Sequence, residues 1–143
     1  MAIRAADPNG QVGRLDLRVG QVEELASVRH ALDEWLNGQG MSEPPRAAFV
    51  LATHEALANA IQHSGFSDSV TVRARAANEG IEIVIRDDGS WKTPDEGAND
   101  ERGRGLSLIR LLVPDAEVRT GGSGTTVRLG HLFTGKGTAD GST

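Results

Sequence analysis

The chain contains 143 residues, which is the size of one typical domain. Apolar residues make up 38% of it, enough for one hydrophobic core without a metal or disulfide staple. The formal net charge of −5 argues against nucleic acid as a direct ligand, because sequence-independent binding to phosphates needs a surplus of Lys and Arg. The absence of cysteine favours a cytoplasmic location. No apolar run approaches the roughly 18 residues of a membrane span, so we expect no membrane contact.

The two ends differ in composition from the middle. Residues 1–13 are small and polar, and residues 134–143 (TGKGTADGST) are rich in Gly, Ser and Thr. Such segments bury too little apolar surface to offset the entropy that is lost on ordering. We therefore expect flexible tails over residues 1–13 and 134–143, and one folded domain over residues 14–133.

The first half of the domain predicts a strand followed by two helices. Apolar and polar residues alternate over residues 14–19, which is the period of a half-buried strand. Over residues 21–37 the apolar positions recur every three or four residues, and Gly38 stands where a helix commonly ends. A second helix begins after Ser42, near two prolines that a first turn tolerates, and runs to about Ser64.

The second half predicts two hairpins separated by a loop and a short helix. Alternating strands over residues 70–76 and 81–87 flank a turn, and strands over 116–120 and 125–132 flank a Gly-rich one. Between the hairpins lie a charged loop over residues 88–102 and an apolar helix over residues 105–113. This order predicts an α+β fold, a two-layer sandwich with helices on one face of a mixed, largely antiparallel sheet.

Three polar side chains form a row on the second predicted helix. Glu55, Asn59 and His63 are spaced four residues apart, which places a carboxylate, an amide and an imidazole in one line along the axis. They border the apolar stripe of the helix instead of facing bulk water. The row is either a functional site or a solvated flank with ordinary helix-stabilising pairs.

Two glycine-containing segments are candidates for contact with a ligand. RDDG ends an alternating strand at Asp87, whose carboxylate can accept a hydrogen bond from a ligand amine, while Gly89 lets the ligand approach the backbone. RGRGL places Gly103, Arg104 and Gly105 at the start of a helix, where N–H groups and positive charge suit an anion. Each segment alone is equally compatible with an ordinary turn.

Two near-matches to other motifs are rejected. HEALA begins like the zinc-protease motif HExxH, but Ala58 stands where the second metal-binding imidazole is needed. Residues 130–137 (GHLFTGKG) have P-loop spacing up to the lysine, yet Gly137 replaces the required Ser or Thr. Neither zinc hydrolysis nor P-loop chemistry is predicted.

Taken in order, four segments resemble one known superfamily. EALANAIQH resembles the N box of the gyrase, histidine-kinase and chaperone ATPases, RDDG their first glycine box, GRGL their second, and GTTV at residues 124–127 their closing strand motif. EALANAIQHSG and GRGLSLIRLL are most similar to the anti-sigma factor serine/threonine kinases within that superfamily. The resemblance implies a Bergerat-type ATP-binding fold, with ATP and Mg²⁺ as ligands.

The resemblance also implies a role for each matching residue. Glu55 matches the general base and Asn59 the magnesium ligand. Trp91 departs from the family pattern, because many members carry a further glycine at that place. The nucleotide contacts implied by the match are Asn59, His63 at the end of the N box, Asp87 and Thr125 for adenine, and Gly89, Gly103, Arg104 and Gly105 on the phosphate side.

The implied activity is that of an ATP-dependent protein serine kinase that is also an anti-sigma factor. Such a protein phosphorylates a serine or threonine on an anti-anti-sigma (STAS-type) partner, sequesters a sigma factor and commonly forms a homodimer. Two alternatives stay open from the sequence: a nucleotide-dependent partner-binding module that transfers no phosphate, and an ATPase domain of a larger signalling system.

Overall fold

The computed structural model describes residues 13–64, 70–87, 107–121 and 124–133. The side chains of residues 63, 64, 120 and 121 are not part of that description. The predicted tails, apart from Gly13, and the predicted charged loop over residues 88–102 lie outside it. So do four predicted site residues and the departure from the family pattern: Gly89, Trp91, Gly103, Arg104 and Gly105.

Five strands form one sheet in the order β1-β2-β3-β5-β4. Each pair of neighbouring strands is antiparallel, so the part of the sheet that the structure describes contains no parallel pair. Every strand bound lies within one residue of the sequence prediction. The strands are β1 (Gly13–Val19), β2 (Val70–Ala76), β3 (Gly80–Asp87), β4 (Glu117–Gly121) and β5 (Gly124–Leu132).

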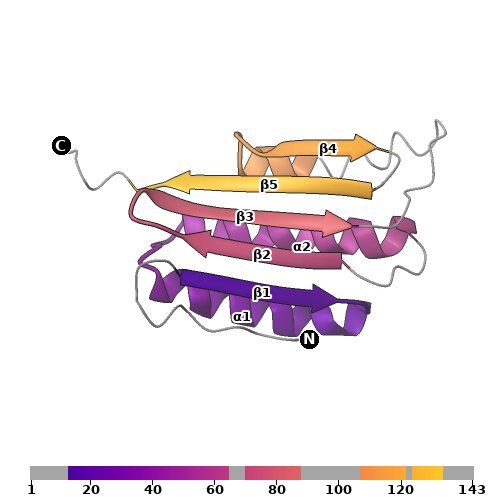
Figure 1. The fold of residues 1–143 in the computed structure, drawn as a ribbon, viewed down its shortest axis with the longest axis horizontal. Helices are drawn as coiled ribbons and strands as arrows, with labels where there is room; N and C mark the ends of the chain where they lie inside the picture. Colours follow the sequence, from indigo (N-terminus) through magenta and orange to yellow (C-terminus); the bar gives the residue numbers. More distant parts are fainter. Residues whose placement is uncertain (1–12, 65–69, 88–106, 122–123, 134–143) are drawn as a thin grey trace.

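The helices cover one face of this sheet (Figure 1). Helix α1 (Leu25–Gly38) packs against β1, and the longer α2 (Pro45–Ser64) packs against β2, β3 and β5. Residues 107–112 are also helical. The two-layer α+β architecture predicted from the sequence is therefore confirmed. None of the described helices is long and apolar enough to cross a membrane.

The first helix begins later than its apolar period predicts. A short 3-10 turn, η1 (Val22–Glu24), precedes α1, which starts at Leu25. The Glu24 carboxylate accepts hydrogen bonds from the backbone N–H of Gly20 at 2.9 Å and of Gln21 at 3.2 Å. These bonds lower the pKa of the Glu24 carboxyl and hold the entering chain in the tighter turn.

Helix α1 ends at Gly38, the glycine at which the sequence predicts its end. The glycine that adopts the left-handed backbone conformation of the helix ending is Gly40, two residues later, with φ of 92°. The Met41 N–H then donates to the Leu36 carbonyl at 3.0 Å, which is the bond of a Schellman ending. The chain is thereby turned toward α2.

Arg46 fastens the end of α1 to the start of α2. Its guanidinium donates to the Asp33 carboxylate at 2.9 Å, the Asn37 side-chain oxygen at 3.1 Å and the Met41 carbonyl at 3.0 Å. A further bond reaches Glu43 at 3.2 Å. The Arg46 side chain is only 17% exposed. Its hydrogen bonds therefore fix the orientation of the start of α2 relative to the end of α1.

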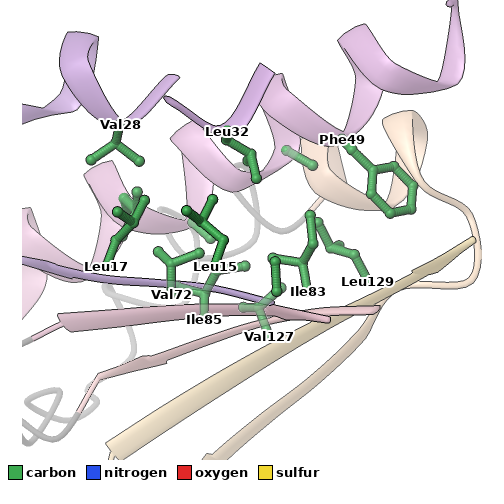
Figure 2. Packing of buried hydrophobic residues seen from close by; sticks show 14 of the residues in the cluster. Leu15, Leu17, Val28, Leu32, Phe49, Val72, Ile83, Ile85, Val127 and Leu129 are labelled. Carbon is green, nitrogen blue, oxygen red and sulfur yellow. The ribbon is translucent and has the colours of Figure 1, made fainter. Parts of the chain in front are cut away.

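The hydrophobic core lies between the sheet and the helices. Figure 2 shows side chains of α1 and α2 pointing toward the apolar side of the strands. Leu32 from α1, Ile83 from β3 and Leu129 from β5 are fully buried there. Because the strands alternate with a period of two, their charged residues other than Asp87 lie on the opposite face. This packing holds α2 above β3 and β5, where the predicted site residues lie.

Candidate functional site

A polar pair interrupts the apolar side of the sheet at one end. Asp87 is the last residue of β3 and is directly opposite Thr125 on β5 in the strand register. Both side chains belong to the core face and are almost fully buried, at 2% and 5% exposure. A buried carboxylate is costly unless it is paired or hydrogen-bonded, so Asp87 is an unusual group on the core face of a strand.

Helix α2 adds an amide to the same place. Asn59 lines a small pocket that Asp87 and Thr125 also line. The remaining lining residues are apolar: Ala56, Ala60, Ile85, Ile109 and Val127. Apolar walls with a few convergent polar groups are typical of a small-molecule site. The structure therefore brings together three of the residues that the sequence singled out.

Two of these polar groups have no partner among the described residues. The Asn59 side-chain nitrogen Nδ2 and the Thr125 hydroxyl Oγ1 are buried, and neither makes a hydrogen bond. Buried polar groups are normally satisfied, and an exception calls for a physical reason such as a ligand. Since the two groups come from a helix and a strand that meet at one pocket, we interpret them as groups directed at a ligand.

The other members of the helical row are placed differently. Glu55 is half-buried on α2, one turn before Asn59, and is absent from the residues that line this pocket. His63 belongs to α2 as predicted, but its side chain is not described. The helical spacing of the row is confirmed, and the individual roles of Glu55 and His63 stay predictions.

The glycine segments flank the pocket in sequence. Asp87 belongs to the first of them and Ile109 follows the second within a few residues, and both line the pocket. The chain is thus anchored at the pocket before residue 88 and again after residue 106. The glycines and Arg104 themselves lie outside the described residues.

Sequence reasoning missed the small and apolar walls of this pocket. Ala56 and Ala60 lie one turn apart on α2 and leave the space that larger side chains would fill. The sequence did contain a sign of this space, because Ala56 and Ala60 each directly follow a residue of the polar row. Ile109 had no separate signal, because a buried residue of a short apolar helix gives no sign of which cavity it faces.

A larger hollow lies at the opposite end of β3 and contains none of the predicted site residues. Its volume is about 470 Å³, and its lining includes Arg75, Gly80, Asp115 and His131. The His131 ring is packed edge-on against Phe49 and Phe133, and burial lowers its pKa below the usual value. We assign the functional site to the smaller pocket, because two of the four buried side-chain groups without a partner among the described residues, those of Asn59 and Thr125, belong to its lining.

The possible ligands for the predicted Mg²⁺ are few. No cluster of three His, Asp, Glu or Cys side chains suited to a metal ion occurs within the described ranges. Mg²⁺ in nucleotide sites commonly uses one or two protein oxygens together with substrate phosphates and water. The side-chain oxygen of Asn59 is a ligand of that kind, so this residue fits that mode of binding.

Comparison with known proteins assigns the chain to a family. Residues 19–130 match the pattern of the histidine kinase-like ATPase domain, and the chain belongs to that family. This membership implies ATP as a ligand of the domain.

Among solved structures, the chain is similar to the crystal structure of the RsbU and RsbW domains of Rv1364c from Mycobacterium tuberculosis. The match has 28% sequence identity and a TM-score of 0.63, and it covers 82% of this chain. It covers 32% of the Rv1364c chain, so the present chain spans about a third of that length.

Proposed function

We propose that this chain is an ATP-dependent protein serine/threonine kinase that acts as an anti-sigma factor in the cytoplasm. The observation that carries the proposal is the pocket in which Asn59, Asp87 and Thr125 converge in a histidine kinase-like ATPase domain. The assignment to the anti-sigma factor kinases is supported by the amino-acid sequences of the segments EALANAIQHSG and GRGLSLIRLL. It is also supported by the similarity to a structure that includes an RsbW domain.

The buried end of the pocket suits an adenine ring. The Asp87 carboxylate accepts a hydrogen bond from the exocyclic amine, and the Thr125 hydroxyl donates to or accepts from a ring nitrogen or a bridging water. Ile85, Ile109 and Val127 provide apolar surface for the faces and edges of the ring. Burial strengthens these polar contacts, since water competes poorly for them.

The phosphates would extend toward the residues that flank the pocket. In this proposal the side-chain oxygen of Asn59 holds Mg²⁺, and backbone N–H groups at Gly89, Gly103 and Gly105 together with Arg104 complement the phosphate charge. When bound, Mg²⁺ neutralises negative charge on the phosphate oxygens. His63 contributes a further polar group to this end of α2.

Transfer itself needs a base and an aligned acceptor. Glu55 takes the proton of a serine or threonine hydroxyl on the partner, whose oxygen forms a bond to the γ-phosphorus. The bond from that phosphorus to the bridging oxygen breaks, and ADP leaves. The chain's contribution is mainly positioning and electrostatic stabilisation, as in other phosphoryl transfers.

The proposed acceptor is an anti-anti-sigma protein of the STAS type. Its unphosphorylated form competes for the kinase, which then releases the sigma factor, and its phosphorylated form leaves the sigma factor sequestered. We further propose that the kinase forms a homodimer. Residues 14–133 serve as the catalytic domain in this proposal, with the segments on either side as flexible tails.

The test is phosphate transfer to a candidate acceptor. The full chain, ATP labelled at the γ-phosphate, Mg²⁺ and an anti-anti-sigma protein from the same organism are incubated, and label on the acceptor is followed with time. We expect label on a serine or threonine of the acceptor. ATP-dependent binding of the acceptor without label would contradict the kinase proposal in favour of a binding module, and release of free phosphate without acceptor would favour a plain ATPase.

A further inference from the structure

The sheet face turned away from the helices carries an unusual charge. We call it the open face; it is the face toward the viewer in Figure 1. Its charged residues give a net charge of +4, although the whole chain carries −5. Seven arginines and three carboxylates lie there: Arg14, Arg18, Arg73, Arg75, Arg86, Arg119 and Arg128, with Asp16, Glu82 and Glu117.

All three carboxylates of the open face are already engaged by two of its arginines. Asp16 lies 3.8 Å from Arg73. Arg128 contacts Glu82 at 3.2 Å and Glu117 at 3.9 Å. The other five arginines of this face are solvent-exposed and form no ion pair within the part of the chain that the structure describes. Within the described ranges, the positive charge of the open face is therefore left uncompensated.

Three of these arginines form a straight row across the sheet. In the strand register Arg18 is opposite Thr71, Thr71 is opposite Arg86, Arg86 is opposite Thr126, and Thr126 is opposite Arg119. This arginine row, Arg18, Arg86 and Arg119, thus crosses all five strands and contains no carboxylate. Neighbouring strands are about 4.8 Å apart, so successive arginines in the row lie about 10 Å apart.

The row gives the fold no stabilisation that would account for it. Exposed arginines that form no ion pair repel one another. The guanidinium of each keeps N–H donors that can bind both oxygens of a carboxylate at once. A hollow in the open face is lined by Arg86 and Arg119, with Thr126 between them, and by the ion pair of Arg128 with Glu117. The arginine row is therefore suited to bind a negatively charged surface, and the hollow between Arg86 and Arg119 can receive a side chain of that surface.

The chemistry of the row favours an acidic protein over nucleic acid. The chain as a whole is negative, so a long polyanion would be repelled by the rest of the molecule. A helix presents every seventh side chain on the same face about 10.5 Å apart, which matches the spacing of the row. We propose that the arginine row binds the acidic face of a helix in a partner protein. The proposal does not depend on the kinase activity.

The proposal is tested with a helical peptide of about 21 residues whose glutamates form one stripe that includes every seventh position. Binding of the labelled peptide to the full chain is measured by fluorescence anisotropy at about 50 mM salt. The triple variant Arg18→Gln, Arg86→Gln, Arg119→Gln is expected to weaken binding at least about tenfold, because each exposed ion pair contributes up to about fivefold. The triple variant with lysine at the same positions is expected to stay within about threefold of the wild type, which separates loss of charge from loss of structure.

A matched pair of single variants locates the effect. Arg86→Gln on the row is expected to weaken binding by about two- to fivefold. Arg110→Gln removes one equally exposed charge from the helical layer and is expected to change binding less than about twofold. Failure of the wild type to bind the striped peptide, or equal binding by the triple glutamine variant, would overturn the proposal. Tighter binding of a DNA duplex, or a self-association of the wild type that the triple variant loses, would also overturn it.

Discussion

Replacing Glu55 with glutamine is expected to slow phosphate transfer by about 10²–10⁴-fold, the usual contribution of a general base. ATP affinity is expected to stay within about threefold of the wild type, because Glu55 does not line the pocket that holds Asn59, Asp87 and Thr125. The substitution keeps the shape of a half-buried side chain on α2, so the fold is expected to persist. Transfer is measured as the initial rate of label incorporation at saturating ATP and acceptor.

The matched control is Glu34→Gln on α1. Glu34 is 69% exposed, and its carboxylate lies 3.3 Å from the ring nitrogen Nε2 of His30, its neighbour one turn earlier. Removing this carboxylate is expected to leave the transfer rate unchanged. A wild-type rate in Glu55→Gln would reject the role of Glu55 as base, and an equal loss in both variants would show that the effect is not specific to Glu55.

Replacing Asn59 with alanine is expected to abolish the part of ATP affinity that depends on Mg²⁺. The amide is the proposed protein ligand of the metal, and alanine offers no oxygen to replace it. The Asn59 nitrogen makes no hydrogen bond to the described residues, so its removal breaks none there. We therefore expect the free energy of unfolding to change by less than about 1 kcal/mol.

The measurement is calorimetric titration with ATP in the presence of Mg²⁺ and in its absence with a chelator. Asn59→Asp keeps an oxygen at the same place and is expected to retain a magnesium effect. If Mg²⁺ raises the ATP affinity of Asn59→Ala as much as that of the wild type, the metal is held elsewhere.

The strands were predictable from the sequence because one face of each is buried. Leu15 and Leu17 alternate with charged residues on β1, which fixes both the period and the buried side. On β3 the buried Ile81, Ile83 and Ile85 alternate in the same way with Glu82, Val84 and Arg86. The start of α1 was not predictable from the apolar period. A side chain at Glu24 that bonds to the preceding backbone decides that boundary locally.

The candidate site was predictable in its polar groups and not in its shape. Asp87 ends a strand and Asn59 belongs to a helical row, so each had a local signal. That both meet Thr125 in one pocket depends on the pairing of β3 with β5 and on the path of α2, which no single segment encodes. The arginine row is similar: each strand shows its arginine, but only the register aligns them.

The most direct test of the adenine-nucleotide site is a titration of the wild-type chain with ATP and with GTP under identical conditions. Adenine presents an amine where guanine presents a carbonyl oxygen, and the Asp87 carboxylate accepts from the first and repels the second. We expect ATP to bind at least about tenfold more tightly than GTP. Equal affinities for the two nucleotides, or no detectable binding of ATP, would contradict the assignment of this pocket.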